Sequence, residues 1–125
     1  MSENITFYWL ENCSTCQKAK RFLERHDLKN FEIRDIKENP LSRDEVVKLS
    51  VMLGGADNLF SRRAVKYREM KLNERELSDA EMIDLMATDY TFLKRPILVI
   101  NGKATAGYFE KFFDIYFRIR VDFSA

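Results

Sequence analysis

The stretch TFYWLENCSTCQKAKRFLE, residues 6–24, decides the fold, because a strand-like run gives way there to a helix-like run. Residues 5–10 are mainly apolar and aromatic, which predicts a short buried strand. From Ser14 onward the apolar side chains recur at helical spacing, at Ala19, Phe22, Leu23 and His26. Cys13 and Cys16 therefore lie where a predicted strand meets a predicted helix.

The two cysteines differ in their predicted surroundings. Cys13 lies directly before or at the first turn of the helix, where backbone N–H groups lack partners and the helix dipole is positive. Both effects favour a thiolate, and cysteines in such places have pKa values lowered to roughly 3.5–7.5. Cys16 lies inside the first turn and is expected to be less exposed. We predict that Cys13 is a nucleophile and that Cys16 resolves a disulfide formed on it.

Other uses of the pair were also considered. A zinc site is disfavoured, because tetrahedral sites need four ligands and the chain has no second Cys-x-x-Cys. We therefore predict no metal site, and we assign the only histidine, His26, to packing or capping. Two cysteines in 125 residues do not make a secreted disulfide framework. The alternative of a module whose cysteines perform no chemistry stays open.

Composition and charge restrict the class of protein. The net charge of +1 provides no bulk attraction for nucleic acid or an acidic membrane, so we predict no direct nucleic-acid contact. No apolar run approaches the roughly 20 residues that a membrane helix needs. The N-terminus leads into the first strand without a signal-peptide layout. We expect a cytoplasmic monomer with one domain over residues 1–125.

Three further strands are predicted from pattern. Residues 31–36 alternate strictly between apolar and polar, and residues 97–100 form an apolar run. Asn101-Gly102 is a two-residue hairpin turn, which predicts a returning strand over residues 103–107. A strand–helix–strand start gives a parallel crossover, whereas the hairpin is antiparallel. The sheet is therefore expected to be mixed.

The remaining segments are predicted to be helical. SRDE at 42–45 and SDAE at 78–81 are capping boxes that open helices, and an aromatic helix is predicted over residues 109–121. The order of elements predicts an α/β protein with a thioredoxin-like fold, which has a four-stranded mixed sheet with flanking helices. A helical insertion at about residues 41–90 would separate its two halves.

Arg95-Pro96 precedes the strand over residues 97–100. Proline is tolerated at the start of a buried strand, where its missing N–H can be dispensed with. In thioredoxin folds the proline at this place is cis and faces the cysteines. Arg95 would project near Cys13, and its permanently charged guanidinium suits an oxyanion or a thiolate.

Five motifs occur along the chain in the order CSTCQKAKRFLE, NPLSRDEVVKL, LFSRRAVKY, LKRPILV and TAGY. Together they resemble the ArsC-like family, which includes arsenate reductases and the Spx regulators. The resemblance extends from about Ile5 to Phe117. It implies a thioredoxin fold with a helical insertion.

In the arsenate reductase branch, the resemblance implies that Cys13 attacks an oxyanion held by three arginines. Arg95 matches one of them, and Arg63, with Arg62 beside it, matches the second. The third falls near Thr105 or Ala106, neither of which is an arginine. The lost charged contact would cost roughly 1.5–3 kcal/mol of oxyanion binding. Asn12 and Pro96 complete the predicted substrate-binding set with Arg63.

In the Spx branch, the resemblance implies that the Cys-x-x-Cys pair is an oxidation switch. Spx proteins bind the C-terminal domain of the RNA polymerase α subunit through a surface that includes a glycine matching Gly55. The pair Gly54-Gly55 also fits a helix C-cap followed by a turn. A glycine pair alone does not assign a role in transcription.

The sequence therefore predicts a thiol-dependent oxidoreductase with no bound cofactor. Cys13, Cys16 and Arg95 would form the catalytic group, acting on a small oxyanion or on a thiol/disulfide substrate. Glutathione, glutaredoxin or thioredoxin would supply the electrons. The alternatives are an Spx-like redox-switched regulator that binds the RNA polymerase α subunit and a non-catalytic thioredoxin-fold module.

Overall fold

The computed structural model describes residues 5–25 and 31–108. The predicted aromatic helix over residues 109–121, like His26, lies outside these ranges. Strand β1 spans Ile5–Trp9, β2 spans Glu32–Asp35, β3 spans Ile97–Ile100 and β4 spans Lys103–Ala106. They form a four-stranded sheet in the order β2-β1-β3-β4.

The sheet is mixed, as predicted. β1 pairs with β2 in parallel, and the β1–β3 and β3–β4 pairs are antiparallel. In the hairpin turn, Asn101 and Gly102 both have positive φ angles, 50° and 84°, which is the conformation that this dipeptide favours. β2 is shorter than predicted because the Asp35 carboxylate accepts hydrogen bonds from the next backbone N–H groups and starts a turn. The predicted thioredoxin-like fold is confirmed.

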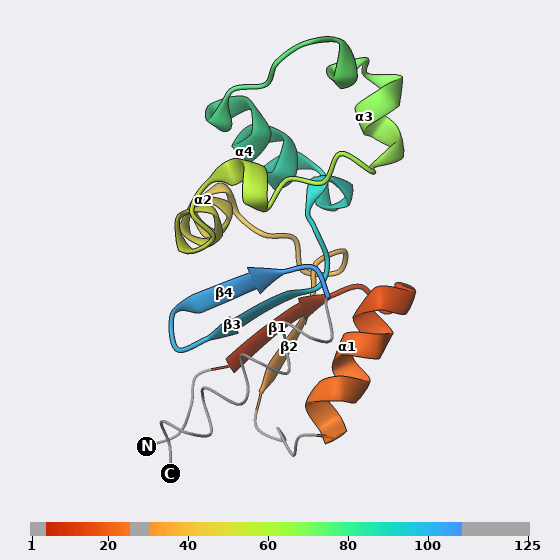
Figure 1. The fold of residues 1–125 in the computed structure, drawn as a ribbon, viewed down its shortest axis with the longest axis vertical. Helices are drawn as coiled ribbons and strands as arrows, with labels where there is room; N and C mark the ends of the chain where they lie inside the picture. The colour runs from red at the N-terminus through yellow and green to blue at the C-terminus, as the bar shows by residue number, and fades with distance from the viewer. Residues whose placement is uncertain (1–4, 26–30, 109–125) are drawn as a thin grey trace.

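The two faces of the sheet are covered by different parts of the chain. Helix α1 (Ser14–Arg25) buries its apolar side against one face, where alternate strand residues point. Figure 1 shows α1 beside the sheet and the helices of the insertion grouped as a separate layer beyond it. The core under α1 consists of Ile5, Phe7, Ala19, Phe22, Leu23, Leu98 and Ile100.

The insertion lies between β2 and β3 and is built from short helices. Its α-helices are α2 (Arg43–Met52), α3 (Val65–Glu69) and α4 (Asp79–Thr88), and its 3-10 helices are η1 (Ala56–Asn58), η2 (Leu72–Glu74) and η3 (Tyr90–Phe92). Both predicted capping boxes are present, because Ser42 and Ser78 exchange hydrogen bonds with Glu45 and Glu81. The insertion packs against the second face of the sheet through a larger core that includes Ile97.

Helix α2 ends at the glycine pair. Gly54 has a φ angle of 85°, and its N–H donates to the Val51 carbonyl at 3.1 Å. The Gly55 N–H donates to the Ser50 carbonyl at 2.8 Å. These two bonds form a Schellman motif, so the predicted helix C-cap is confirmed.

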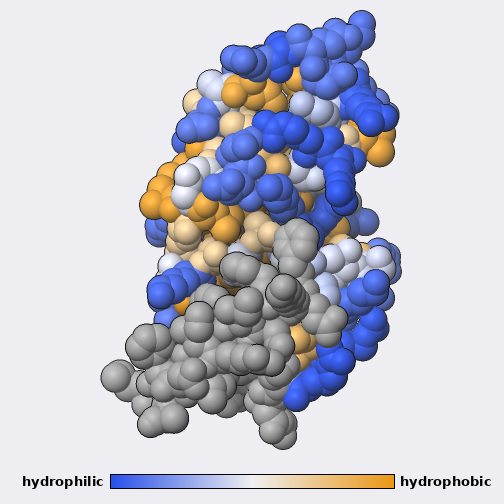
Figure 2. All heavy atoms as spheres, viewed as in Figure 1, coloured by the Kyte–Doolittle hydropathy of each residue, from blue (hydrophilic) through white to orange (hydrophobic). Residues whose placement is uncertain are grey.

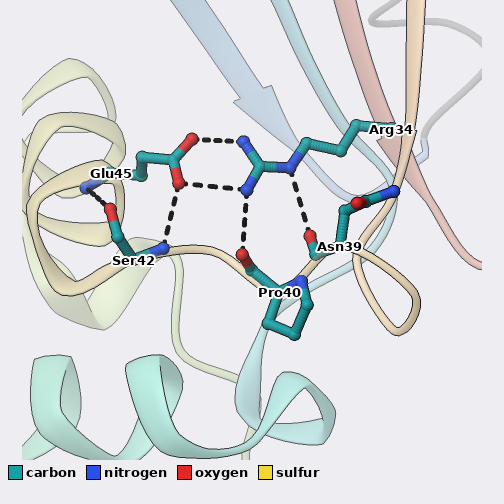
Figure 3. Close-up of polar contacts among 5 residues, drawn as sticks. All are labelled: Arg34, Asn39, Pro40, Ser42 and Glu45. Atoms are coloured by element: carbon teal, nitrogen blue, oxygen red, sulfur yellow. Dashed lines mark hydrogen bonds and ion pairs between the residues drawn. The ribbon is translucent and has the colours of Figure 1, made fainter.

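Arg34 joins the edge strand β2 to the insertion. Its guanidinium pairs with the Glu45 carboxylate of α2 through two nitrogens and also donates to the Asn39 and Pro40 carbonyls at 3.1 and 2.8 Å (Figure 3). Hydrogen bonds from Arg34 lower the pKa of Glu45 below its usual value, although partial burial opposes them. One side chain therefore fixes both the turn after β2 and the start of α2.

Asp89 fixes the other end of the insertion, between α4 and η3. Its carboxylate accepts hydrogen bonds from the Thr91 N–H and hydroxyl at 2.9 and 2.7 Å and pairs with Lys66 of α3. Burial acts to raise the pKa of Asp89, but the bonds from Lys66 and Thr91 outweigh it and lower the pKa to about 2. The contact therefore holds η3, which leads to Arg95-Pro96.

The surface in the view of Figure 2 is mainly polar over the insertion, with separate apolar areas between the polar side chains. The most exposed large apolar residues are Val51, which is 75% exposed at the end of α2, and Val65, which is 72% exposed on α3. Among the helices in residues 5–25 and 31–108, none is long and apolar enough to cross a membrane.

Candidate active site

Cys13 is the N-cap residue of α1. Its N–H donates to the Leu10 carbonyl at 3.3 Å, and its carbonyl accepts the Gln17 N–H at 2.9 Å. Its sulfur accepts the Cys16 N–H at 3.3 Å, in the place where the side-chain oxygen of a serine or aspartate usually caps a helix. This N–H has no partner within the helix, so the Cys13 sulfur supplies the acceptor that the first turn lacks. The predicted position at the helix start is confirmed.

Cys16 has a different environment. It is fully buried, whereas Cys13 is half-buried, and both cysteines are free thiols. Burial raises the pKa of Cys16 to about 12, and its hydrogen bond with Cys13 acts in the same direction. Cys16 is therefore a neutral thiol at neutral pH. The structure thus separates one more accessible sulfur from one enclosed sulfur, and Cys16 is the less exposed of the two, as predicted.

Arg95 and Pro96 lie just before β3, at the end of the central strands from which β1 leads to the cysteines. The register pairs Tyr8 of β1 with Ile97 of β3, so Pro96 is placed beside the end of β1, from which the chain runs to Cys13. The Arg95–Pro96 peptide bond is cis, which the sequence left open, and Pro96 is buried.

The Arg95 side chain is half-buried, and its charge acts to lower the pKa of Cys16 against the larger effect of burial. Within the described residues, its guanidinium has no hydrogen bond and no ion pair. The structure therefore brings the Arg95 cation to the cysteine pair. No carboxylate of the described residues neutralises its charge.

The structure does not join Arg63 to the cysteines by any contact. The Arg63 side chain is exposed, and in residues 5–25 and 31–108 it finds no hydrogen-bond or ion-pair partner. Its segment is nevertheless tied to that of Arg95, because the Ser61 N–H donates to the Phe92 carbonyl at 2.7 Å and the Lys94 N–H donates to the Leu59 carbonyl at 2.9 Å. Arg63 remains a predicted substrate ligand.

The other candidates are placed as follows. Arg62 is paired with Asp57 at 2.6 Å, which leaves it less available to an anion than Arg63. Asn12 is exposed in the turn before Cys13. At the place of the third arginine, Thr105 is buried, and its hydroxyl oxygen has no hydrogen-bond partner in the described part of the chain.

The sequence did not identify Gln17 as a residue of this site. Its side-chain amide donates to the Glu11 carbonyl at 2.6 Å, so it reaches back across the turn that precedes Cys13. No sequence motif indicated it, because Gln17 is one residue beyond the capping-box position and donates to a carbonyl instead of accepting an N–H. The reach of the side chain depends on the shape of the turn, which the sequence does not specify.

Comparisons with known proteins agree with the fold and the motifs. A sequence model described as the ArsC family matches residues 8–114. The uncharacterized protein YusI of Bacillus subtilis is 37% identical over 114 residues, which cover 89% of this chain and 96% of that protein. The global transcriptional regulator Spx of Streptococcus mutans is 34% identical over 107 residues, which cover 85% of this chain and 77% of that protein.

Solved structures show the same architecture. An arsenate reductase from Vibrio cholerae superimposes with a TM-score of 0.76, covering 85% of this chain and 91% of that one. Its sequence is 24% identical, so this likeness concerns the fold.

Proposed function

The chain belongs to the ArsC family, and on this premise we propose that it is a thiol-dependent oxidoreductase with Cys13 as nucleophile and Cys16 as resolving cysteine. The observation that carries the proposal is the Cys13 sulfur at the N-cap of α1, where it accepts the Cys16 N–H at 3.3 Å. A thiolate is the reactive form of cysteine, and a helix start stabilises it. The half-buried Arg95 adds a positive charge that acts on the cysteine pair, because it acts to lower the pKa of Cys16 against the larger effect of burial.

The proposed reaction with a disulfide substrate has two steps. The Cys13 thiolate attacks one sulfur, which forms a mixed disulfide on Cys13 and releases the first product as a thiolate. The Cys16 sulfur then attacks Cys13 and releases the second product, which takes up the proton that Cys16 loses. The substrate is reduced to two thiols and the enzyme holds a Cys13–Cys16 disulfide. Glutathione, glutaredoxin or thioredoxin returns two electrons and two protons.

The proposed substrate class is a thiol/disulfide compound or a small oxyanion. Arg95 and Arg63 would hold the anionic group, with Asn12 and Pro96 lining the site. Because no arginine stands at Thr105 or Ala106, an oxyanion with two charges would lack its third cation. This departure favours a disulfide over arsenate.

The test is turnover of glutathione mixed disulfides and of arsenate, with glutathione and glutaredoxin as donors. Wild type is compared with Cys13→Ser and Cys16→Ser, which change one atom each. We expect Cys13→Ser to be inactive. Without a donor thiol, Cys16→Ser should stop at the mixed disulfide, which mass spectrometry detects. A wild type that is no faster than Cys13→Ser on every substrate would refute the proposal.

A second candidate function is a redox-switched regulator that binds the C-terminal domain of the RNA polymerase α subunit. The Spx of Streptococcus mutans and the regulatory protein MgsR of Bacillus subtilis, which is 31% identical over 86% of this chain, favour it. The structure offers a route, because the Lys94–Leu59 hydrogen bond links the neighbour of Arg95 to the segment that follows Gly55. Oxidation of the cysteines would then alter the surface around Gly55.

Retention of this protein on the immobilised α-subunit domain, under reducing and oxidising conditions, tests the regulator. We expect Val51→Glu to abolish retention, because Val51 is exposed close to Gly55 in sequence. Val65→Glu is the matched control, as Val65 is equally exposed on α3. Absence of retention in both redox states would exclude this function. If turnover were absent as well, the remaining alternative would be a thioredoxin-fold module whose cysteines perform no chemistry.

We further propose that the protein acts in the cytoplasm as a monomer of one domain and without direct contact to nucleic acid. Its balanced charge and its two cysteines support this setting. Light scattering of the reduced protein in solution tests the monomer, and a mass of twice 14.8 kDa would contradict it.

A further inference from the structure

Gln17 holds the turn in front of Cys13 from two sides. Its backbone N–H donates to the Cys13 carbonyl at 2.9 Å, and its side-chain amide donates to the Glu11 carbonyl at 2.6 Å. The same residue thus closes the first helical turn and draws the preceding chain down onto it. Gln17 is exposed, so this second bond is not required to satisfy a buried group.

Few other contacts hold the turn that precedes Cys13. Glu11 and Asn12 are exposed, and the Cys13 N–H reaches the Leu10 carbonyl at 3.3 Å, which is long for a bond between backbone groups. The backbone angles of Cys13 depend on this turn, and they decide whether its sulfur lies over the Cys16 N–H. A shift of the sulfur weakens the hydrogen bond that it accepts from the Cys16 N–H.

We propose that Gln17 is a positioning residue for the reaction at Cys13. It acts through the turn and does not touch the substrate. This inference rests on the proposed function, because it assigns to Gln17 the placement of the proposed nucleophile. The N–H donor of the Gln17 side chain raises the reactivity of the Cys13 sulfur by holding the turn in place.

The chemistry required at position 17 follows from the bond. The partner is a carbonyl oxygen, so the side chain must donate. Methionine has a similar length but no donor, and glutamate presents a second acceptor whose charge opposes a thiolate. Arginine carries donors that reach the same carbonyl, and is therefore the rescuing variant.

The test measures how fast Cys13 reacts in Cys16→Ala protein, so that only one thiol is counted. Two probes are used at pH 7: iodoacetamide, and glutathione disulfide, which the Cys13 thiolate attacks to form a mixed disulfide and release one glutathione thiolate. Gln17→Met, Gln17→Glu and Gln17→Arg are compared, each with its urea unfolding midpoint. Lys48→Met is the matched control, because Lys48 is exposed on α2 and has no partner in the described residues.

We expect Gln17→Met to react about three- to tenfold more slowly, in line with the loss of one hydrogen bond, and Gln17→Glu to react more slowly still. Gln17→Arg should return to within about twofold of the parent, and Lys48→Met should match it. The unfolding midpoints of the four variants should agree, because the bond lies in an exposed turn. An unchanged rate in Gln17→Met, or a slow Gln17→Arg, would overturn the proposal, and so would rates that merely follow the unfolding midpoints.

The outcome is separable from the proposed function, since neither probe requires turnover. Slower labelling of Gln17→Met in a protein that turns over no substrate would sustain the positioning role and defeat the oxidoreductase. Normal labelling of Gln17→Met in an active protein would sustain the oxidoreductase and defeat the positioning role of Gln17.

Discussion

Burial of Cys16 makes the protein less stable at alkaline pH, by an amount that can be worked out from its pKa. In the unfolded chain a cysteine ionises near pH 8.5, whereas the folded Cys16 holds its proton up to about pH 12. The contribution of this group is fully present below pH 8.5 and is lost as pH rises toward 12, because only the unfolded chain gains the charge. Between pH 7.5 and pH 10 the loss is about 2 kcal/mol of the free energy of unfolding.

Urea unfolding of reduced wild type and Cys16→Ala, each at pH 7.5 and pH 10, measures this loss. The alanine variant is less stable at both pH values because it leaves a small cavity, but that cost does not change with pH. Other groups that titrate in this range are common to both proteins, so they cancel in the comparison. We expect wild type to lose about 2 kcal/mol more than the variant. Equal losses would show that Cys16 is not enclosed as described.

Three further changes have defined outcomes. Arg34→Met removes a bidentate ion pair with Glu45, in which the two side chains are 24% and 35% exposed, so the free energy of unfolding in urea should fall by about 2 kcal/mol. The control Arg43→Met removes an exposed ion pair and should cost about 0.5 kcal/mol or less. Equal effects would show that Arg34 does not stabilise the joint between β2 and α2. The pKa of Asp89 is lowered to about 2, so its contribution to the free energy of unfolding is present above pH 4 and lost as pH falls toward 2. Between these pH values wild type should therefore lose about 1–2 kcal/mol more stability than Asp89→Asn, as measured from unfolding midpoints. Parallel acid profiles of the two proteins would refute this role of Asp89. Arg95→Gln should slow mixed-disulfide formation with glutathione disulfide about tenfold, with Arg95→Lys intermediate, and unchanged rates in both would remove Arg95 from the site.

Much of the fold could be predicted because local patterns and tertiary structure agree. The capping boxes at Ser42 and Ser78 and the glycine pair after α2 use only neighbouring residues, and all three are present. The strand ends were less certain, because the turn that stops β2 depends on the Asp35 side chain accepting from the following N–H groups. Local chemistry of that kind competes with strand pairing, and apolar periodicity does not report it.

The residues of the candidate site also differ in how far the sequence could predict them. Cys13 and Cys16 could be located because their spacing and their place before a helix are properties of one segment. Arg95 required the fold, since only strand pairing brings it from the other half of the chain to the cysteines. Gln17 was missed because its role depends on the path of a turn.

The Cys13 sulfur, which we propose as the nucleophile, also caps helix α1. When this sulfur forms a covalent bond, it becomes a weaker acceptor, and the hydrogen bond that it accepts from the Cys16 N–H weakens. In the proposed reaction, each cycle of exchange would therefore weaken and restore this contact in the first turn of α1. The amide proton of Cys16 should therefore exchange with solvent deuterium faster once Cys13 is alkylated than when its sulfur is free.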